Sequence, residues 1–513
     1  MATAWVLGEL MDTKTYMDWS GVDTRSETDA ADPKTLRTAT NVDLNTDLGL
    51  TERPGLRLVA VVDASSVGLY SVGGSLRAAM AAGHSKPFSV QGTVPILYDF
   101  VGDGSVYTLA SVTKVTSVSS WDADSAQGIY PVIVIQRDTG RHEIHWIKDL
   151  PVSAVDATPP PAYEPSTDPV STKLTLPFTP GPTILKIQEK MCAVDNTNGA
   201  VWFCATVDRP SSTSAALLYA LEDWTTEGDA GFLPVLRHCT GDRTIQGLSF
   251  YDDLMAVLFR DSIQLWQMSA SPAQMSLVRV LRGPGVQSPG SVANARGDLI
   301  YFSSGVFSSL RRSAVNGQLT DGDIGAAIAP ETKPLASEET LALWFQGRSA
   351  YYCFFAGQGV AWRYMTSPTS KTKGWTKYEL PAGITTDAVV EHLGELYLRS
   401  GVNVYRFENG YADGSTYTVD TQFLTLGTPD EMKFVNSMNF TGAGSPTVSC
   451  FYDMNSPDSR ETLCTLDGST GSMVTVMVLE NSVAPGFRLS GAVGSGFVLD
   501  KLSFKSAVED TEE

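Results

Sequence analysis

Apolar and polar residues alternate along most of this chain, and between Gly199 and Phe407 the alternation returns as a repeated unit. Each unit holds two short apolar runs joined by a tight polar turn. The units start at Ala200, Leu254, Asp298, Ser349 and Glu395. They therefore recur every 44 to 54 residues. With Tyr, Trp, Val and Phe on the apolar positions, this pattern predicts strands half buried between stacked sheets, and the period is typical of the blades of a β-propeller.

The same alternation continues with less regularity before this region. Strand-like pairs between Leu56 and Leu150 predict two or three further blades, so the propeller is predicted to span residues 57–410 with roughly six to eight blades. Nine prolines in residues 151–182 argue against a regular helix or a central strand, and predict a linker or a projecting loop inserted in the propeller. The polar, irregular residues 1–56 predict an N-terminal arm.

The repeated unit stops after Phe407. Longer strand-like runs, separated by turns rich in Gly, Ser, Pro and Asp, then predict a β-sandwich-like domain over residues 411–513, which ends in an acidic segment from Val508. The predicted fold class is therefore all-β, with an arm, a propeller and a C-terminal β-domain.

Charge narrows the classes of function. The 513 residues carry a formal net charge of −20, and no basic stripe is present, which argues against tight binding of a nucleic-acid backbone. Two explanations of the negative charge stay open. The charge provides solubility, or the acidic residues line a surface that repels a polyanion, so that the polyanion slides along it without binding.

No apolar run approaches the roughly 20 residues of a membrane span, and the N-terminus does not resemble a secretory signal. We therefore expect no membrane span and folding in a cytoplasm. The six cysteines lack metal-site spacing and are expected to be reduced thiols.

The candidate chemical motifs are weak. His142 and His145 form H-x-x-H, but residues three apart in a strand point to opposite faces. Residues 321–323, Asp-Gly-Asp, contain only part of a calcium loop. The neighbouring Asp252 and Asp253 are the kind of acid pair that a propeller glycosidase needs, yet adjacent acids in a turn are usually solvated. We predict no catalytic, metal-binding or cofactor-binding residue and no enzymatic activity.

The N-terminal arm carries the clearest resemblance to a known family. Its passage from Leu36 to Asp43 contains Asn41, and it is followed by Arg53, Pro54 and Gly55. This order resembles the opening of the tail nozzle proteins of short-tailed bacteriophages, also called packaged-DNA stabilisation proteins or tail tubular protein B. Later segments resemble the family's central hairpin, from Ile245, and a further blade, from Gly290. The segments from Gly374 and Gly394 resemble its late blade and the exit into its C-terminal domain.

The resemblance implies a structural virion protein, assembled in the host cytoplasm and located in the phage tail. Such proteins form a homo-oligomeric ring, usually sixfold, below the portal and adaptor and in contact with tail fibre or needle proteins. The ring closes the exit channel, and double-stranded DNA passes through its lumen without specific binding. A wall bearing carboxylates would suit that passage, because it has no positive charges that would bind the phosphates at fixed positions.

Two other classes of function remain open from the residues alone. One is a propeller that binds a glycan or a peptide on its top face, with the C-terminal β-domain as a docking module. The other is a propeller glycosidase.

Overall fold

The fold is known from a computed structural model, and it is almost entirely β-structure, which confirms the predicted all-β class. The described residues are 12–17, 19–25, 32, 34–45, 49–62, 64–81, 91–94, 96–101, 112–122, 129–147, 172–206, 220–239, 241–316, 319–337, 339–366, 373–424, 433–451, 460–466, 468–477, 481–482 and 484–508. The acidic end after Val508 and most of the Pro-rich segment lie outside them.

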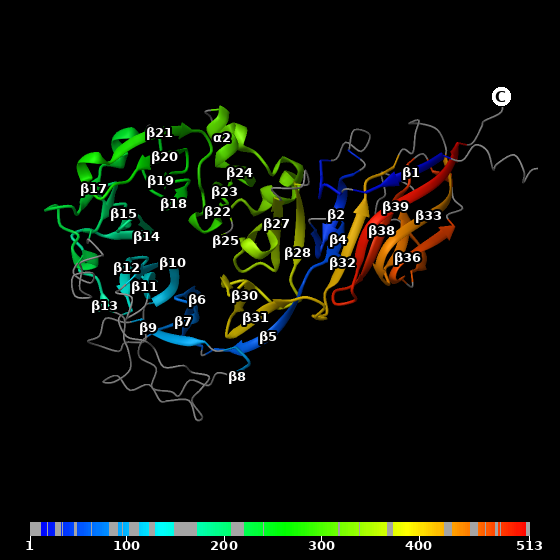
Figure 1. Ribbon diagram of the computed structural model, residues 1–513, viewed down its shortest axis with the longest axis horizontal. Helices are drawn as coiled ribbons and strands as arrows, with labels where there is room; N and C mark the ends of the chain where they lie inside the picture. Colours follow the sequence, from blue (N-terminus) through cyan, green and yellow to red (C-terminus); the bar gives the residue numbers. More distant parts are fainter. Residues whose placement is uncertain are drawn as a thin grey trace, which may run out of the picture.

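Within the described residues, seven groups of strands follow one another around a ring, at the left of Figure 1; six are small separate sheets and the sixth in order is part of a nine-stranded sheet. The innermost strands of these groups are β6 (Ser66–Val72), β10 (Val112–Asp122), β14 (Pro180–Ile187), β18 (Gly247–Tyr251), β22 (Ala293–Ala295), β25 (Thr340–Phe345) and β29 (Ala388–His392). Each innermost strand contacts the next, and β29 contacts β6 again. This closed cycle is the arrangement of blades around the axis of a β-propeller.

The remaining strands extend each blade outward by antiparallel pairing, except that β9 runs parallel to β7 in the first blade. In the first three blades they are β7 (Ser75–Ala81) and β9 (Leu97–Val101); β11 (Ile129–Arg137), β12 (His142–Trp146) and β13 (Thr172–Lys173); β15 (Lys190–Asp195), β16 (Ala200–Phe203) and β17 (Gly231–Leu233). In the next three they are β19 (Leu254–Leu258), β20 (Ser262–Gln267) and β21 (Ser276–Arg282); β23 (Asp298–Ser303) and β24 (Val306–Ser309), followed by helix α2 (Leu310–Asn316); β26 (Ala350–Phe355), β27 (Val360–Thr366) and β28 (Lys373–Glu379).

The seventh blade is completed by a strand from the start of the chain. Its strands β30 (Glu395–Ser400) and β31 (Asn403–Glu408) follow β29, and β31 then pairs with β5 (Gly55–Val61). The short β8 (Gln91–Gly92) pairs with the other edge of β5. The ring is therefore closed by hydrogen bonds between distant parts of the sequence.

The repeated sequence unit corresponds to the second and third strands of a blade. From Leu254, Asp298, Ser349 and Glu395 the two apolar runs form such a hairpin. The run at Ala200 differs, because it forms the single strand β16, whose hairpin partner β15 precedes it. A turn closed by the carboxylate of Asp195, which accepts the backbone N–H groups of residues 197 and 198, joins the two.

The C-terminal part is a sandwich of two facing sheets, at the right of Figure 1. One sheet contains β3 (Val42–Leu44), β4 (Leu50–Glu52), β39 (Val498–Val508), β33 (Lys433–Gly444) and β36 (Gly468–Met477), with β1 (Asp12–Tyr16) and β37 (Asn481–Ser482) at its edges. The other contains β2 (Leu36–Thr40), β32 (Thr416–Thr421), β38 (Gly486–Ala492), β34 (Thr447–Phe451) and β35 (Glu461–Thr465). Residues 1–56, expected as an arm, thus supply strands to both sheets.

The propeller and the sandwich share one sheet and one core. Strand β2 pairs with β28 of the sixth blade on one side and with β32 of the sandwich on the other. One buried apolar cluster runs from Phe307 and Trp375 of the propeller, through Trp19, to Phe487 and Phe504 of the sandwich. Because apolar surface and backbone hydrogen bonds are buried across the boundary, the two parts form one continuous body.

The prediction of a loop or linker was wrong at the end of the Pro-rich segment. Pro180 and Pro182 lie in β14 rather than in a loop. This strand pairs with β15 along one edge only, and its register shifts between Pro180 and Ile184. A proline is tolerated on such an edge, because the missing N–H group would have had no ladder partner there.

Candidate functional site

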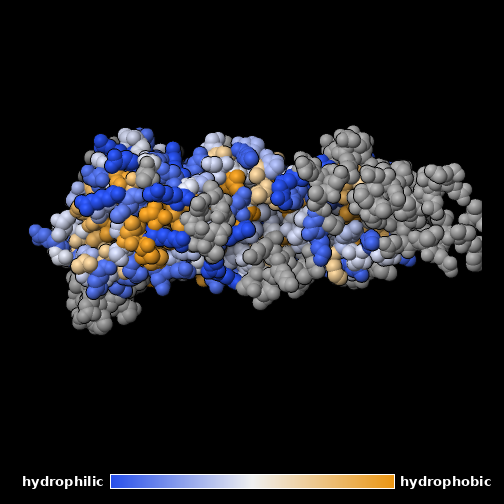
Figure 2. Space-filling model, turned by 90° about the horizontal axis from the view of Figure 1, so that it is seen from above, coloured by the Kyte–Doolittle hydropathy of each residue, from blue (hydrophilic) through white to orange (hydrophobic). Residues whose placement is uncertain are grey.

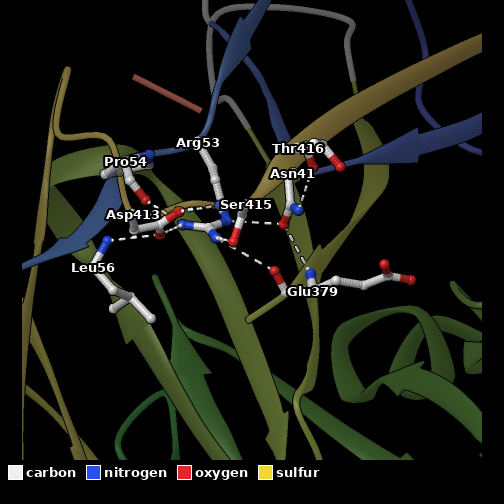
Figure 3. Close-up of polar contacts among 8 residues, drawn as sticks. All are labelled: Asn41, Arg53, Pro54, Leu56, Glu379, Asp413, Ser415 and Thr416. Atoms are coloured by element: carbon white, nitrogen blue, oxygen red, sulfur yellow. Dashed lines mark hydrogen bonds and ion pairs between the residues drawn. The ribbon is translucent and has the colours of Figure 1, made fainter. Parts of the chain in front are cut away.

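The four residues of the family resemblance lie together at the junction between propeller and sandwich (Figure 3). Asn41 occupies the turn between β2 and β3 in a left-handed conformation, with φ 56°. Arg53 and Pro54 connect β4 to β5, and Gly55 begins β5. The two pieces of the sequence pattern are therefore neighbours in space.

Arg53 is the centre of this junction. Its side chain is fully buried, with 0% of its surface exposed. Nε donates to Asn41 Oδ1 at 2.8 Å, and Nη1 donates to the Pro54 carbonyl oxygen at 2.8 Å. The other three bonds run from Nη1 to Asp413 Oδ2 at 2.8 Å and from Nη2 to Ser415 Oγ at 2.9 Å and to the Glu379 carbonyl oxygen at 3.3 Å. All five guanidinium N–H groups are thereby used.

Asp413 balances the charge of Arg53. It also accepts the backbone N–H groups of Leu56 and Ser415, at 2.9 and 3.0 Å. Burial raises the pKa of the Asp413 carboxyl, but the charge of Arg53 and these hydrogen bonds outweigh burial and leave the pKa below its usual value. The buried pair is therefore ionised and fully hydrogen-bonded.

Asn41 and Gly55 fit the same junction. The side chain of Asn41 donates to the Thr416 carbonyl oxygen at 2.7 Å and accepts the Glu379 N–H at 2.8 Å, which links β32 to the end of β28. A Cβ atom on Gly55 would lie 1.8 Å from the Tyr411 carbonyl oxygen, so only glycine permits this approach. We conclude that the four residues join the two parts of the chain.

Residues of the inner strands surround a central space, here called the channel. It consists of two adjoining cavities of about 830 and 740 Å³, which share lining residues such as Thr116, Gly290 and Leu341. The larger one is lined mainly by apolar and hydroxyl side chains from the inner strands, and its charged lining residues are Lys186 and Asp387. The smaller one, here called the channel mouth, lies where several of these strands begin, and it carries most of the charged lining residues.

Charged side chains from several blades meet at the channel mouth. Lys114 of β10 and Glu339, just before β25, form an ion pair of 2.6 Å. Asp387 precedes β29 and accepts the Gly401 N–H at 2.6 Å. Arg399 of β30 lines the same cavity. These positions were not singled out from the sequence, because no local pattern marks residues that converge only when the ring closes.

The acid pairs considered from the sequence do not line the channel. Asp252 and Asp253 form the hairpin turn between β18 and β19, where Asp252 has φ 48°. Asp323 accepts the Gly325 N–H at 2.8 Å within a turn. Among the described lining residues of the channel, the carboxylates are Glu339 and Asp387.

The H-x-x-H motif is divided between two environments. His142 lines the channel mouth, whereas His145 is buried and lies 3.2 Å from Glu143. Glu143 also accepts hydrogen bonds from Arg137 Nη2 and Lys173 Nζ, both at 2.7 Å. The described part of the chain contains no group of three or more His, Cys, Asp or Glu side chains that could hold a metal ion.

The Glu143 cluster predicts an acid-sensitive contribution to stability. The hydrogen bond to His145, with those to Lys173 and Arg137, lowers the pKa of the Glu143 carboxyl despite its partial burial. A carboxyl with a lowered pKa in the folded state stabilises the fold above its unfolded pKa, here 4.5, and loses that contribution as the pH falls further. We expect Glu143→Gln to destabilise the protein by about 1 kcal/mol at neutral pH.

Chemical denaturation at pH 6 and at pH 3 measures this effect. The difference between wild type and Glu143→Gln should shrink at the lower pH, because the unfolded wild-type chain is then protonated at Glu143 and must release that proton when it folds. A difference that is constant over this range would contradict the assignment.

No helix among the described residues combines the length and the apolar character that crossing a membrane requires. The six cysteines are free thiols.

Comparison with known proteins identifies no family. No protein-family model and no curated protein matches the chain. Two similar solved structures are exo-β-1,3-galactanases from Phanerochaete chrysosporium, one with β-1,3-galactotriose and one with galactose. Their sequence identities are 11% and 10%, and their TM-scores 0.26 and 0.23. Each match covers 75% of this chain and 95% of the other.

These two structures correct one prediction. Both are carbohydrate-active enzymes, so the expectation that this chain has no enzymatic activity is contradicted, and we withdraw it. At such TM-scores the similarity assigns no activity, substrate or catalytic residue to this chain.

Proposed function

We propose that this chain is a structural subunit of a phage tail nozzle, present in the virion after assembly in the host cytoplasm. In this proposal, copies of the chain form a sixfold ring below the portal and adaptor proteins, and tail fibre or needle proteins attach to it. The ring closes the exit channel until infection and then conducts double-stranded DNA.

The observation that carries the proposal is the junction around Arg53. The residues that resemble the nozzle family, Asn41, Arg53, Pro54 and Gly55, are the ones that fix the propeller to the sandwich. A ring that confines pressurised DNA needs subunits that do not bend between their parts. A buried junction with every guanidinium N–H satisfied, inside a shared sheet, meets that need.

Two further features support a protein that works in an assembly. Phe232 and Val278, on the outer strands of the third and fourth blades, have 47% and 56% of their surface exposed. Figure 2 shows apolar residues gathered among hydrophilic ones on one face of the propeller. Exposed apolar surface of this kind marks protein contacts. The net charge of −20 suits a lumen wall that phosphates pass without binding.

Quantitative mass spectrometry of purified virus particles tests the nozzle proposal. We expect a small fixed number of copies per particle, close to one ring, when this chain is counted against the major capsid protein. Absence from the particles would overturn the proposal. A copy number that rises and falls with the purity of the preparation would overturn it as well.

The channel supports a second candidate, a propeller that binds a glycan or a peptide. Its two cavities of about 830 and 740 Å³ are large enough for an oligosaccharide, and the channel mouth presents hydroxyl, amide and charged groups together. A glycan array probed with the purified chain tests this candidate, and chromogenic sugars distinguish binding from cleavage in the same preparation.

A further inference from the structure

Arg399, on strand β30, is a buried cation of the seventh blade. Only 8% of its surface is exposed, and no carboxylate among the described residues forms an ion pair with it. Nη1 donates to the Ser66 carbonyl oxygen at 2.5 Å, whereas Nε is buried without a hydrogen-bond partner. Burial lowers the pKa of its guanidinium, and the charge of nearby Asp387 only partly opposes this effect. A buried cation left in this state is costly unless an anion joins it.

The other cations at the channel mouth already have partners. Lys114 is paired with Glu339 at 2.6 Å, and Arg260 lies 3.7 Å from Asp242. Arg399 is therefore the lining cation that lacks an ion-pair partner within the described part of the chain. Since the protein as a whole repels anions, an anion bound here would need this specific local charge.

Neutral polar groups surround the same cavity. Gln136, Gln287 and Ser288 line the channel mouth, and so does Thr340, whose hydroxyl donates to Ser288 Oγ at 2.8 Å. Amide and hydroxyl groups of this kind exchange hydrogen bonds with sugar hydroxyls. The deeper, less polar cavity adjoins them, so the channel mouth can hold a ligand that carries an anionic group and several hydroxyls.

We propose that the channel mouth binds an acidic saccharide, with Arg399 as the partner of its carboxylate. The planar guanidinium offers paired N–H groups that match the two oxygens of a carboxylate, and the pair is strengthened by partial burial. The cavity of about 740 Å³ suits a short oligosaccharide. This inference rests on the second candidate function and names the ligand class for it.

Isothermal titration calorimetry with trigalacturonate and with its fully methyl-esterified form tests the inference, because the two probes differ in charge and share their sugar framework. We expect the wild-type chain to bind the free acid at least about tenfold more tightly than the ester, a difference of about 1.4 kcal/mol. Equal binding of both would overturn the acidic-ligand inference and leave a glycan-binding propeller standing. Absence of binding by the free acid would overturn the inference directly.

Two variants with the same change in charge assign the site. Arg399→Gln should weaken binding of trigalacturonate at least about tenfold. Arg57→Gln removes a guanidinium that pairs with Glu408 at the outer edge of the seventh blade, and it should leave binding unchanged. If Arg399→Gln fails to fold, Arg399→Lys keeps the charge but loses the paired N–H groups, so it should bind the acid more weakly than wild type and still prefer the acid to the ester. Undiminished binding by a folded Arg399→Gln variant would contradict the assignment.

Discussion

Replacing Arg53 with methionine is expected to destabilise the protein by about 3–5 kcal/mol, because it leaves the carboxylate of Asp413 buried without its counter-charge. The change also removes five hydrogen bonds at the centre of the junction. Chemical denaturation at neutral pH measures the loss.

Acid should also lower the stability of the wild-type protein. Since the pKa of Asp413 is lowered in the folded state, its contribution is present above the unfolded pKa of 3.8 and is lost below it.

Arg57 provides the matched control for Arg53. It lies four residues away on β5, and its ion pair with Glu408 is partly exposed to solvent. Arg57→Met removes the same kind of charge from a site that water can compensate, so stability should change little. Similar losses of stability in Arg53→Met and Arg57→Met would show that burial does not increase the contribution of the Arg53–Asp413 ion pair to stability.

Replacing Gly55 with alanine is expected to cost at least about 2 kcal/mol, because the new methyl group meets backbone atoms that cannot rotate away. The ideal Cβ position is 1.8 Å from the Tyr411 carbonyl oxygen and 2.8 Å from its carbonyl carbon. Tyr411 lies just beyond β31, so relief requires β5 and the segment around Tyr411 to move apart, next to the first pair of the β5–β31 register, Gly55 with Glu408. Thermal unfolding and limited proteolysis should both report a less stable seventh blade.

Gly359 gives the corresponding control. It has an ordinary backbone conformation, and a Cβ there would meet its nearest atom, the Ile384 carbonyl oxygen, at 3.5 Å. Gly359→Ala should therefore fold with nearly wild-type stability. A Gly55→Ala variant as stable as Gly359→Ala would mean that Tyr411 moves freely and that the junction is less constrained than its contacts indicate.

The hairpins of the propeller could be predicted because their information is local. Alternating residues and short turns place β19 with β20 and β26 with β27 without reference to the rest of the chain. The role of β5 could not be predicted in this way, since its partner β31 is determined by closure of the ring. The strands at Pro180 and in residues 1–56 were missed for the same reason, because tertiary pairing decides them.

The site residues show the same difference between local and tertiary information. Asn41, Arg53, Pro54 and Gly55 were found through a resemblance, but their partners Asp413 and Glu379 were not, because nothing in the local sequence marks them. Lys114, Glu339 and Arg399 come from three different blades and meet only at the channel mouth. Residues that are brought together only when the ring closes leave no periodic pattern in a single sequence.

The pairing of β5 with β31 also determines the order in which the chain can fold during synthesis. The ribosome makes β5 first, but its partner emerges only after the intervening blades are complete. Until then β5 has no β31 to pair with, and the nascent ring stays open between the first and seventh blades. Contacts of such long sequence separation form slowly. We therefore expect protection of the β5 amides from exchange to appear late in refolding, after the central blades are protected, and a chaperone that shields β5 would raise the yield of folded protein.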